Sequence, residues 1–550
     1  MTGPEPTESL GEFAVACLVA NGVDTVFGIP GTHNIELYRG VRRHGVRHVL
    51  TRHEQGATYG ADGYARATGR PGVVIATSGP GATNCITGIA NAYADSVPLL
   101  VISPGAPQGQ ERRDLGFLHE AKDQRAGIDR FAAASIRVES KPALAEAIHQ
   151  AFLSWRTGRA RPVHIEIPTD LIGERSPVTP TTRWEGTPAV APEASVDAAV
   201  DALARARRPM VVAGGGAVDA GAELTVFAEL TGVPVVTTLQ GKGVVDETHP
   251  LSLGARAGDS FGFAVLAEAD LVLALGTELK HANIAPTATL VRIDIDAAQL
   301  HKHRRAELPV LGDVAHALRA MTAHPRLPRD TVSPGWVATV RDASDAGAAP
   351  AMATWSVLHA AVIEGARGAG DGPVVLTGDS SQISWLGTVQ TAVLEGPRRF
   401  LTTDGYATLG YSLPAAIGAT LAVPEARVVA LLGDGAFMFS VQELATASEL
   451  GIGLPVVVFD NGGYAEIETN MRDADLEPFA VALTPPDYDA LARAFHCGYI
   501  EANRPDDLAS AVREAFGAGR PTIIRITAND FAAESWRPAN LRTEHLKESS

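Results

Sequence analysis

Two glycine-rich turns in the last third of the chain carry the residue types that bind a divalent cation and a phosphate. Gly433-Asp434-Gly435 follows one apolar run, and Asp460-Asn461-Gly462-Gly463 follows the next, after 24 intervening residues. A carboxylate, an amide oxygen and a backbone carbonyl form a partial oxygen shell, which Mg²⁺ prefers and which diphosphate oxygens and water complete. Because glycine lets backbone N–H groups approach a phosphate, the two turns together predict a magnesium diphosphate site.

Glu54 is a second candidate for chemistry. It begins a stretch of helical character that ends before Gly69. A carboxyl group at this place serves as a general acid or base if it is buried beside a ligand. The same residue type also favours the first turn of any helix, because the helix dipole stabilises a negative charge there. Residue type and position alone leave both interpretations open.

These candidate residues lie on elements that alternate between strands and helices along the whole chain. Short apolar runs that end in glycine-rich or polar turns are typical of buried parallel strands. Strands are predicted at residues 23–27, 47–51, 72–77, 99–103, 209–213, 271–275, 290–295, 373–376, 427–432 and 455–459. Helices are predicted at residues 34–43 and 54–67, from the turn at 78–81 to about residue 94, and from a capping box of Ser440 and Glu443 to residue 451. The alternation predicts an α/β fold of three doubly wound parallel-sheet domains.

Two stretches rich in proline and small residues divide the chain into three parts. One lies near residues 176–195 and the other between residues 323 and 350. We therefore expect domains at residues 1–180, 190–335 and 350–530, followed by a polar tail at residues 531–550 that forms a mobile arm.

The composition excludes several classes of protein. The chain has 550 residues, of which 45% are hydrophobic and 20% charged, a balance typical of a soluble globular protein rather than a disordered or fibrous one. The net charge of −17 argues against binding to nucleic acid or to an anionic membrane. Three cysteines form no CxxC pair, and no apolar run is long enough to span a membrane or to act as a secretion signal. We expect a cytoplasmic protein with no membrane or nucleic-acid partner.

Several motifs in a fixed order resemble the thiamine diphosphate enzymes of the acetolactate synthase and 2-oxo acid decarboxylase superfamily. Besides the two turns above, the matching segments are Phe27-Gly28-Ile29-Pro30-Gly31, Arg52-His53-Glu54-Gln55-Gly56-Ala57, Ala76-Thr77-Ser78-Gly79-Pro80-Gly81-Ala82-Thr83-Asn84 and Leu413-Pro414-Ala415-Ala416-Ile417-Gly418. The resemblance covers nearly the whole chain. It implies that the three domains are a pyrimidine-binding, a central and a diphosphate-binding domain.

The resemblance also implies a role for individual residues. Glu54 would hold the pyrimidine ring and promote ionisation of the cofactor, the Ala407 carbonyl would accept from its amino group, and Leu409 would bend the two rings together. Asp434, Asn461 and the Gly463 carbonyl would bind Mg²⁺. The other residues expected to contact thiamine diphosphate are Gly28, Pro30, Ser381, Gln382, Gly433, Gly435, Ala436 and Tyr464. Asp460 stands where the family usually has asparagine, which adds a carboxylate beside the metal site.

The type of reaction is less clearly indicated. In this family a carbanion formed from a 2-oxo acid is either protonated to an aldehyde or joined to a second carbonyl compound. His33 and His119 are the candidate catalytic proton shuttles, and Thr32, His33, Thr77, His119 and Glu466 are the candidate substrate residues. Gly105 stands where acetolactate synthases usually have glutamine, which favours a decarboxylase, with an acetolactate synthase-like carboligase as the alternative.

One branch of the family fits the substrate segments better than the others. The segments at residues 118–124 and 460–467 look closest to the 5-guanidino-2-oxopentanoate (2-ketoarginine) decarboxylases, and Glu466 or Glu120 would then pair with a cationic tail. Residues 276–279 lack the arginine expected of a bound FAD, so FAD is the less favoured alternative. A nicotinamide dehydrogenase is excluded because Asn84 and Met438 interrupt the GxGxxG pattern. The family implies a homodimer or homotetramer with active sites shared between chains.

Overall fold

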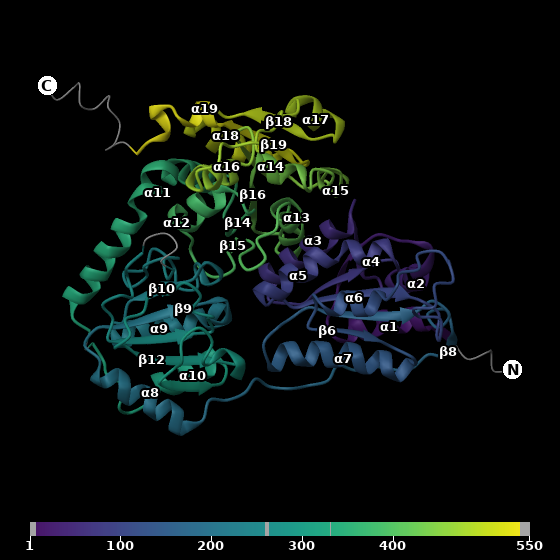
Figure 1. The fold of residues 1–550 in the computed structure, drawn as a ribbon, viewed down its shortest axis with the longest axis horizontal. Coiled ribbons are helices and arrows are strands. Elements are labelled where there is room, and N and C mark those ends of the chain that lie inside the picture. The colour runs from purple at the N-terminus through teal and green to yellow at the C-terminus, as the bar shows by residue number, and fades with distance from the viewer. Residues whose placement is uncertain (1–6, 259–262, 331, 539–550) are drawn as a thin grey trace. The chain divides into compact units, whose positions relative to one another are not determined.

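The computed structural model describes residues 7–258, 263–330 and 332–538, which form two compact units. Unit 1 comprises Met1–Thr187, Gly405–Pro424 and Phe439–Ile452, and unit 2 comprises Pro188–Asp404, Glu425–Met438 and Gly453–Ser550 (Figure 1).

Unit 1 is built on one parallel sheet of six strands in the order β3-β2-β4-β5-β7-β6. Its strands are β2 (Thr25–Gly28), β3 (Arg47–Leu50), β4 (Gly72–Ile75), β5 (Leu99–Gly105), β6 (Ala134–Arg137) and β7 (Val163–Pro168). A separate antiparallel pair joins β1 (Thr7–Ser9) to β8 (Arg175–Pro177). Val73, Ile75, Leu100 and Ile102 face one core, and Val74, Leu99 and Val101 face the other, so the sheet is buried on both faces as a doubly wound fold requires.

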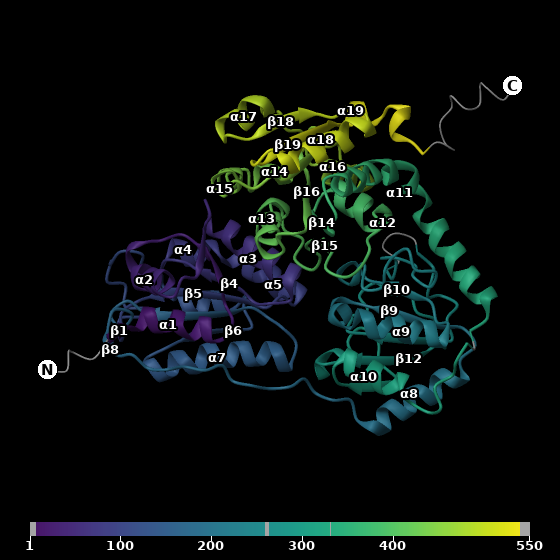
Figure 2. The same ribbon diagram turned by 180° about the vertical axis from the view of Figure 1, so that it is seen from behind.

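Helices cover both faces of this sheet. One face packs against α1 (Leu10–Ala20), α2 (Ile35–Arg43) and α7 (Lys141–Thr157), of which α1 and α7 lie side by side in Figure 2. The other face packs against α3 (Glu54–Thr68) and α5 (Ile86–Asp95). The unit also contains η1 (Thr32–Asn34), α4 (Pro80–Asn84), α6 (Gln124–Asp129), α13 (Ser412–Ala422) and α15 (Glu443–Glu449). α13 packs closely on α3 because a Cβ at Gly63 would lie 2.3 Å from the Ala415 carbonyl oxygen, so only glycine permits this approach.

Unit 2 contains two further parallel sheets. The first has the order β10-β9-β11-β12-β13 and the second the order β15-β14-β16-β17-β19-β18. The strands of the first sheet are β9 (Pro209–Ala213), β10 (Val235–Thr237), β11 (Leu271–Leu275), β12 (Thr289–Asp294) and β13 (Leu308–Leu311). Its α-helices are α8 (Glu193–Arg205), α9 (Gly221–Thr231) and α10 (Val314–Thr322). The short 3₁₀ helices η2 (Gly215–Ala220), η3 (Leu239–Gly241) and η5 (Ala297–Gln299) lie in the same part of the chain.

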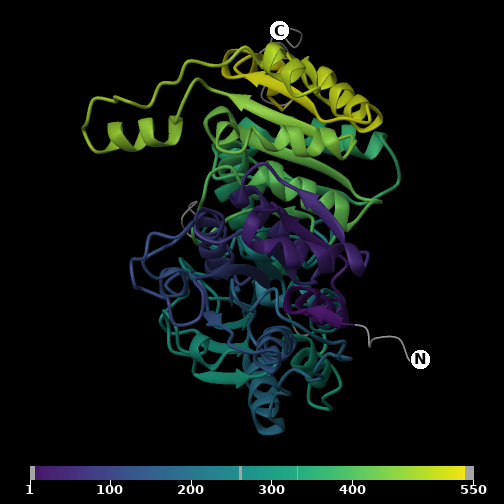
Figure 3. The same ribbon diagram turned by 90° about the vertical axis from the view of Figure 1, so that its right-hand side faces the viewer.

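The second sheet of unit 2 carries the turns with Asp434 and Asn461. Its strands are β14 (Val374–Gly378), β15 (Phe400–Leu401), β16 (Arg427–Gly433), β17 (Pro455–Asp460), β18 (Gly498–Glu501) and β19 (Thr522–Thr527). Its helices are α11 (Pro334–Gly368), the π-helix η6 (Ile383–Thr388), α12 (Val389–Thr391), α14 (Asp434–Met438), α16 (Ala465–Asp473), α17 (Tyr488–Ala494), α18 (Pro505–Gly517), α19 (Ala528–Phe531) and η7 (Glu534–Trp536). The yellow-green segment that contains α16 extends away from the rest of unit 2 (Figure 3), and none of the α16 residues is buried.

α11 is long and apolar enough to cross a membrane by length and composition alone. In the structure Trp355, Leu358 and Val362 of this helix are buried in the core beneath the second sheet of unit 2, and the helix packs against α18. These contacts are those of a core helix in a globular domain.

The candidate residues follow the strands at which the order of each sheet reverses. In unit 1 the chain runs from β2 to β3 on one side and then crosses to β4 on the other, so the crevice lies between the carboxyl ends of β2 and β4. In the second sheet of unit 2 the same reversal occurs between β14 and β16. Ligands of open α/β sheets bind at such switch points. The topology therefore places His33 and Thr77 at one of them, and Gln382 and Asp434 at the other.

The α/β fold class with three doubly wound parallel sheets is confirmed, and all ten predicted strands are present within about two residues of their expected bounds. The prediction of one continuous helix from the turn at residues 78–81 to about residue 94 is wrong in one respect. Two helices, α4 and α5, form there and are separated by Cys85. α11 runs through Pro350, so part of the stretch between residues 323 and 350 is helical, and the domain boundary expected there stays a prediction. The expected mobile tail begins with a packed segment in which Trp536 is fully buried, and residues 539–550 lie outside the described residues.

A buried histidine makes the stability of unit 1 sensitive to acid. His164 on β7 is fully buried between the hydroxyls of Ser103 (2.8 Å) and Ser135 (2.7 Å), and burial lowers its pKa to about 3. Since the unfolded chain binds this proton near pH 6.5 and the folded chain does not, stability falls as the pH decreases from 6.5 towards 3, by about 1.4 kcal/mol per pH unit. Denaturant unfolding of the wild type and of His164→Gln between pH 7 and 4.5 measures this slope. An equal slope in both proteins would contradict it.

Candidate active site

Glu54 is buried at the first position of α3 in unit 1, with only 8% of its surface exposed. The side-chain amide of Asn84 donates to its Oε2 at 2.9 Å. The preceding residue, His53, caps the helix by accepting from the backbone N–H of Gln55 at 3.1 Å. Glu54 is therefore a buried carboxyl group with one oxygen held by an amide donor.

A narrow cradle lies beside Glu54. A Cβ at Gly81 would lie 2.7 Å from Thr77 Cγ2 and 3.3 Å from Glu54 Oε1, and a Cβ at Gly31 would lie 2.8 Å from Thr77 Oγ1. The Thr77 hydroxyl is buried and has no hydrogen-bond partner among the described residues. Because a buried hydroxyl without a partner is costly, this atom is a candidate for contact with a ligand.

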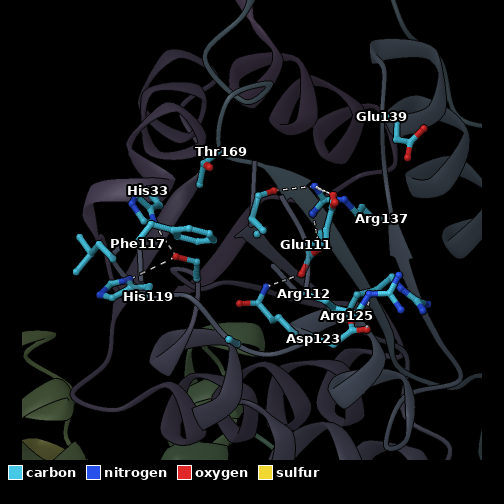
Figure 4. Close-up of a pocket in the computed structure, with 17 residues that line it drawn as sticks. His33, Glu111, Arg112, Phe117, His119, Asp123, Arg125, Arg137, Glu139 and Thr169 are labelled. Carbon is cyan, nitrogen blue, oxygen red and sulfur yellow. Dashed lines mark hydrogen bonds and ion pairs between the residues drawn. The ribbon is translucent and has the colours of Figure 1, made fainter. Parts of the chain in front are cut away.

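Two histidines meet in the pocket that Figure 4 shows. The Nδ1 atom of His33 lies 2.6 Å from Ser78 Oγ, and the Nδ1 atom of His119 lies 3.3 Å from the same oxygen. The two rings pack edge to face with their centroids 5.4 Å apart. Burial, followed by the neighbouring His119, lowers the pKa of His33. His33 and His119, which were predicted as separate candidates, thus share one serine.

The far side of this pocket is lined by a network of charged residues. Arg137 donates to Glu166 Oε1 at 2.7 Å and also pairs with Glu111, while the Gln124 amide donates to Glu166 Oε2 at 2.8 Å. Burial raises the pKa of Glu166, and Arg137 opposes that shift. Gly105 lies directly against this carboxylate, because a Cβ there would be 2.2 Å from Glu166 Cδ.

The contact at Gly105 predicts that a side chain at this position breaks the network. The Gly105→Gln variant is expected to lose about 1–3 kcal/mol of stability, because Glu166 must leave Arg137 and Gln124 to make room. Thermal unfolding monitored by circular dichroism measures the loss. Gly127→Gln is the matched control, since nothing lies within 4 Å of a Cβ at Gly127. Equal stability of Gly105→Gln and the wild type would contradict the prediction.

A second buried glutamate holds the start of α3 in place. Glu443 is fully buried, and its carboxylate accepts from the backbone N–H groups of Arg52 and His53, both at 3.1 Å, and from the Thr446 hydroxyl at 2.6 Å. The prediction that Glu443 forms a capping box with Ser440 is wrong, because the carboxylate instead binds the segment just before Glu54. Glu443 thereby positions the catalytic candidate.

In unit 2, the two glycine-rich turns bring the polar groups of Asp434, Asn461 and Gly463 together. One atom of the Asn461 side-chain amide lies 2.9 Å from the carbonyl oxygen of Gly463 and 3.2 Å from Oδ1 of Asp434. When the amide nitrogen faces Gln382 Oε1 at 3.4 Å, the amide oxygen faces the other two oxygens. Neighbouring ligands of an octahedral Mg²⁺ are about 3 Å apart, so this spacing fits such a cation. Burial raises the pKa of Asp434 to about 6, and a nearby positive charge would counter that shift.

The remaining candidates of unit 2 surround these ligands. Ser381 Oγ accepts from the backbone N–H of Gly433 at 3.1 Å, and Gln382 Nε2 lies 3.5 Å from Glu466 Oε2. The Tyr464 ring packs on Gly435, where a Cβ would be 2.7 Å from Tyr464 Cε1. Hydroxyl, amide and backbone N–H donors thus gather at the switch point between β14 and β16.

The unusual Asp460 is compensated by an arginine on the neighbouring strand. Arg525 on β19 donates to Asp460 Oδ2 from Nε at 2.9 Å and from Nη2 at 2.7 Å. Oδ1 of Asp460 accepts from the backbone N–H of Gly462 at 3.1 Å, which shapes the turn that contains Asn461. The additional carboxylate is therefore neutralised, and Asn461 remains the residue that faces Asp434.

The geometry agrees with comparisons of the sequence. Three domain profiles of the thiamine pyrophosphate enzymes match: the N-terminal TPP-binding domain at residues 8–126, the central domain at residues 196–321 and the C-terminal TPP-binding domain at residues 381–526. The chain belongs to the thiamine pyrophosphate enzymes. It is a decarboxylase or carboligase of this family.

The named relatives include a decarboxylase and acetolactate synthases. The chain is 39% identical over 537 residues to "Probable 2-ketoarginine decarboxylase AruI" of Pseudomonas aeruginosa, covering 95% of this chain and 94% of that protein. It is 33% identical to the acetolactate synthase large subunit of Parasynechococcus marenigrum, covering 92% and 85%. It is 30% identical to a probable acetolactate synthase large subunit of Methanocaldococcus jannaschii, covering 97% and 94%. The resemblance inferred from the motifs is thus confirmed.

The residues of this thiamine pyrophosphate enzyme fit the cofactor at both switch points. In unit 1 the fit rests on buried Glu54 and the hydroxyl of Thr77 that lacks a partner. In unit 2 it rests on the Asn461 side-chain amide, which lies 2.9 Å from the Gly463 carbonyl oxygen and 3.2 Å from Asp434 Oδ1. In the central sheet the Gly216 N–H donates to the Gly276 carbonyl at 2.9 Å, which joins its two glycine loops directly.

The segment expected to shape the cofactor is an irregular loop of unit 1. Ala407 is exposed and has a φ of 52°, a left-handed conformation that costs a non-glycine residue about 1–2 kcal/mol and is frequent at functional sites. Leu409 is half-buried and Thr408 bonds Tyr59 at 2.6 Å, so the loop is anchored to α3 beside its exposed part. The roles of Ala407 and Leu409 stay predictions.

The other predicted residues lie near those already described. Gly28 ends β2 with a φ of 147°, and a Cβ there would be 2.0 Å from the Ile75 carbonyl oxygen, while Pro30 and Thr32 are exposed in the turn that follows. Ala436 is buried in α14. Glu120 binds its own loop through the N–H groups of Leu115 and Gly116, which leaves Glu466 as the exposed alternative for a cationic substrate.

Four residues of the two sites were not predicted from the sequence: Ser78, Glu443, Glu166 and Arg525. Ser78 stood inside a matched motif, and Glu443 stood in a pattern that fitted a different local contact. Glu166 and Arg525 act through pairing across strands, for which one sequence carries no signal.

Proposed function

We propose that the protein decarboxylates a 2-oxo acid with thiamine diphosphate and Mg²⁺ and releases an aldehyde. The observation that carries this choice is the pair of histidines joined by Ser78 in the pocket of unit 1. An aldehyde forms only when a proton is delivered to the reacting carbon, and imidazoles are the side chains best suited to deliver it near neutral pH. An acetolactate synthase-like carboligase is the second candidate, and identity to such enzymes favours it.

Each side chain has one task in this proposal. Thiamine diphosphate, when bound, supplies the carbon nucleophile and accepts the electron pair that carbon dioxide leaves behind. Glu54 shares a proton with the pyrimidine ring of the cofactor, and Thr77 donates to a bound group. Leu409 supports the rings, and Ala407 offers its carbonyl. His33 and His119 deliver the proton that completes the product.

Mg²⁺ is held in this proposal by Asp434, Asn461 and the Gly463 carbonyl. Ser381, Gln382 and the backbone N–H groups of the Gly433 turn then contact the diphosphate. The spacing of the three oxygens and the buried carboxylate of Asp434 support this assignment.

The substrate we propose carries a cationic tail, such as the guanidino group of 2-ketoarginine. The name of the relative AruI supports this class, and exposed Glu466 at the start of α16 is the residue we assign to the tail. The panel that tests it contains pyruvate, branched, aromatic and guanidino 2-oxo acids, with carbon dioxide and the organic product both measured. An acyloin or acetohydroxy acid as the main product would replace the proposal by the carboligase. A preference for an uncharged acid would remove the role of Glu466.

We also propose a cytoplasmic homodimer or homotetramer in which Glu54 of one chain serves the cofactor whose diphosphate the second chain holds. The expected result is that Glu54→Gln and Asp434→Ala proteins, each inactive, recover about a quarter of the wild-type activity after mixing and reassembly, since mixed dimers restore one complete site. Activity after refolding together, compared with each variant refolded alone, measures the recovery. Absence of any recovery would contradict shared sites.

A further inference from the structure

Ser78 touches both histidines of the pocket, and this double contact restricts where their protons lie. Its hydroxyl is buried, at 4% residue exposure, and lies 2.6 Å from Nδ1 of His33 and 3.3 Å from Nδ1 of His119. A hydroxyl carries one hydrogen and two lone pairs, so it donates to at most one of these nitrogens and, when it does, accepts from the other. A neutral imidazole has one N–H and one bare nitrogen. When the hydroxyl donates to one ring, the two rings therefore differ in the nitrogen that carries the proton.

The two distances indicate the direction of the bonds. A bond from a hydroxyl to a ring nitrogen is shorter than a bond from a ring N–H to a hydroxyl oxygen. The contact of 2.6 Å therefore fits Ser78 donating to His33, and the contact of 3.3 Å fits His119 donating to Ser78. His33 then carries its proton on Nε2, and His119 carries its proton on Nδ1. Neither Nε2 atom has a hydrogen-bond partner in the described part of the chain, so both are available to a ligand.

The backbone around Ser78 holds both rings at these distances. A Cβ at Gly79 would lie 2.8 Å from His119 Cβ and 2.7 Å from the His119 carbonyl oxygen, so the loop of His119 rests on the residue after Ser78. Glu120 ties that loop through the N–H groups of Leu115 and Gly116. Gly79 itself donates to Gln124 Oε1 at 2.7 Å. The serine and both rings are thus fixed by contacts outside the trio.

We propose that Ser78 is a positioning residue that holds His33 and His119 in opposite tautomers and so makes them a proton donor and a proton acceptor. This inference rests on the proposed decarboxylation, which consumes one proton for each aldehyde formed. The Nε2 proton of His33 passes to the reacting carbon, and the Ser78 proton passes to Nδ1 of His33. The Nδ1 proton of His119 passes to Ser78, and solvent supplies a proton to Nε2 of His119. Both rings end neutral with their tautomers exchanged.

The test reads the tautomers directly in the full chain without cofactor or substrate. Nitrogen NMR of protein labelled at the histidine rings distinguishes a protonated Nδ1 from a protonated Nε2, and the variants His33→Asn and His119→Asn assign the two signals among 16 histidines. We expect Nε2–H for His33 and Nδ1–H for His119 in the wild type. In Ser78→Ala, we expect both rings to have the Nε2–H form that free histidine prefers. The same tautomer in both wild-type rings, or tautomers unchanged in Ser78→Ala, would overturn the proposal.

Kinetics separate this role from a purely structural one. Ser78→Ala is expected to lower kcat by about 10²-fold while KM stays within about twofold, because the relay acts after substrate binding. Thr83→Ala is the matched control, since the Thr83 hydroxyl is exposed and bonds only the Pro80 carbonyl at 3.1 Å. Ser78→Thr keeps the hydroxyl and is expected to restore both the tautomers and kcat. If the wild type has opposite tautomers but releases no carbon dioxide from any 2-oxo acid, the proposed decarboxylase function is refuted. The inference that Ser78 holds the two rings in opposite tautomers is then kept.

Discussion

Replacing Glu54 by glutamine is expected to lower kcat for the 2-oxo acid by about 10²–10⁴-fold without unfolding the protein, because the amide keeps the shape of the carboxyl group but cannot share a proton with the cofactor. Glu54 is buried, begins α3 and has one oxygen bound by Asn84. Carbon dioxide release at saturating thiamine diphosphate and Mg²⁺ measures the effect.

A control and a second readout make this result specific to Glu54. Glu146→Gln changes an exposed carboxyl group on α7 and is expected to leave kcat unchanged. Thermal unfolding of Glu54→Gln should remain close to that of the wild type, since Gln55, Glu443 and the rest of the helix start are untouched. Wild-type kcat in a folded Glu54→Gln protein would exclude Glu54 from the reaction.

The parts of the fold and site that could be predicted from the sequence are those determined within one strand and the turn after it. Apolar runs such as residues 209–213 and 271–275 became strands with the predicted bounds, because a strand buried on both faces needs a continuous apolar sequence. The closeness of Asp434 and Asn461 could be predicted because both turns follow neighbouring parallel strands, whose carboxyl ends must meet.

The parts that could not be predicted depend on pairing between distant segments. Glu443 has the spacing of a capping box with Ser440. Its carboxylate instead accepts from the backbone N–H of His53, which lies 390 residues away in the sequence. The same holds for Asp460, whose charge is neutralised by Arg525 on the adjacent strand β19. One sequence shows which residues have polar groups, and only packing decides which of several compatible partners each group meets.

The proposed metal site allows a sharper test, because its residue types differ in charge. Asp434 is the only full negative charge among the proposed ligands, since Asn461 and the Gly463 carbonyl are neutral. Asp460 does not replace it, because both of its oxygens are already bound by Arg525 and Gly462. Replacing the carboxylate of Asp434 by an amide should therefore leave only neutral oxygens, which hold Mg²⁺ poorly.

Asp434→Asn is accordingly expected to weaken the binding of thiamine diphosphate in the presence of Mg²⁺ by more than about 100-fold, since even partners outside the ligand shell change metal affinity by 10–100-fold. Calorimetric titration of cofactor into the protein, with Mg²⁺ and with EDTA, measures both the affinity and its dependence on the metal. Asp475→Asn is the matched control in the same unit, because Asp475 has a φ of 56°, which asparagine adopts equally well. If Asp434→Asn retains wild-type affinity that EDTA still abolishes, the metal is bound elsewhere. If EDTA has no effect on the wild type either, the diphosphate is held by the serine, glutamine and glycine donors alone.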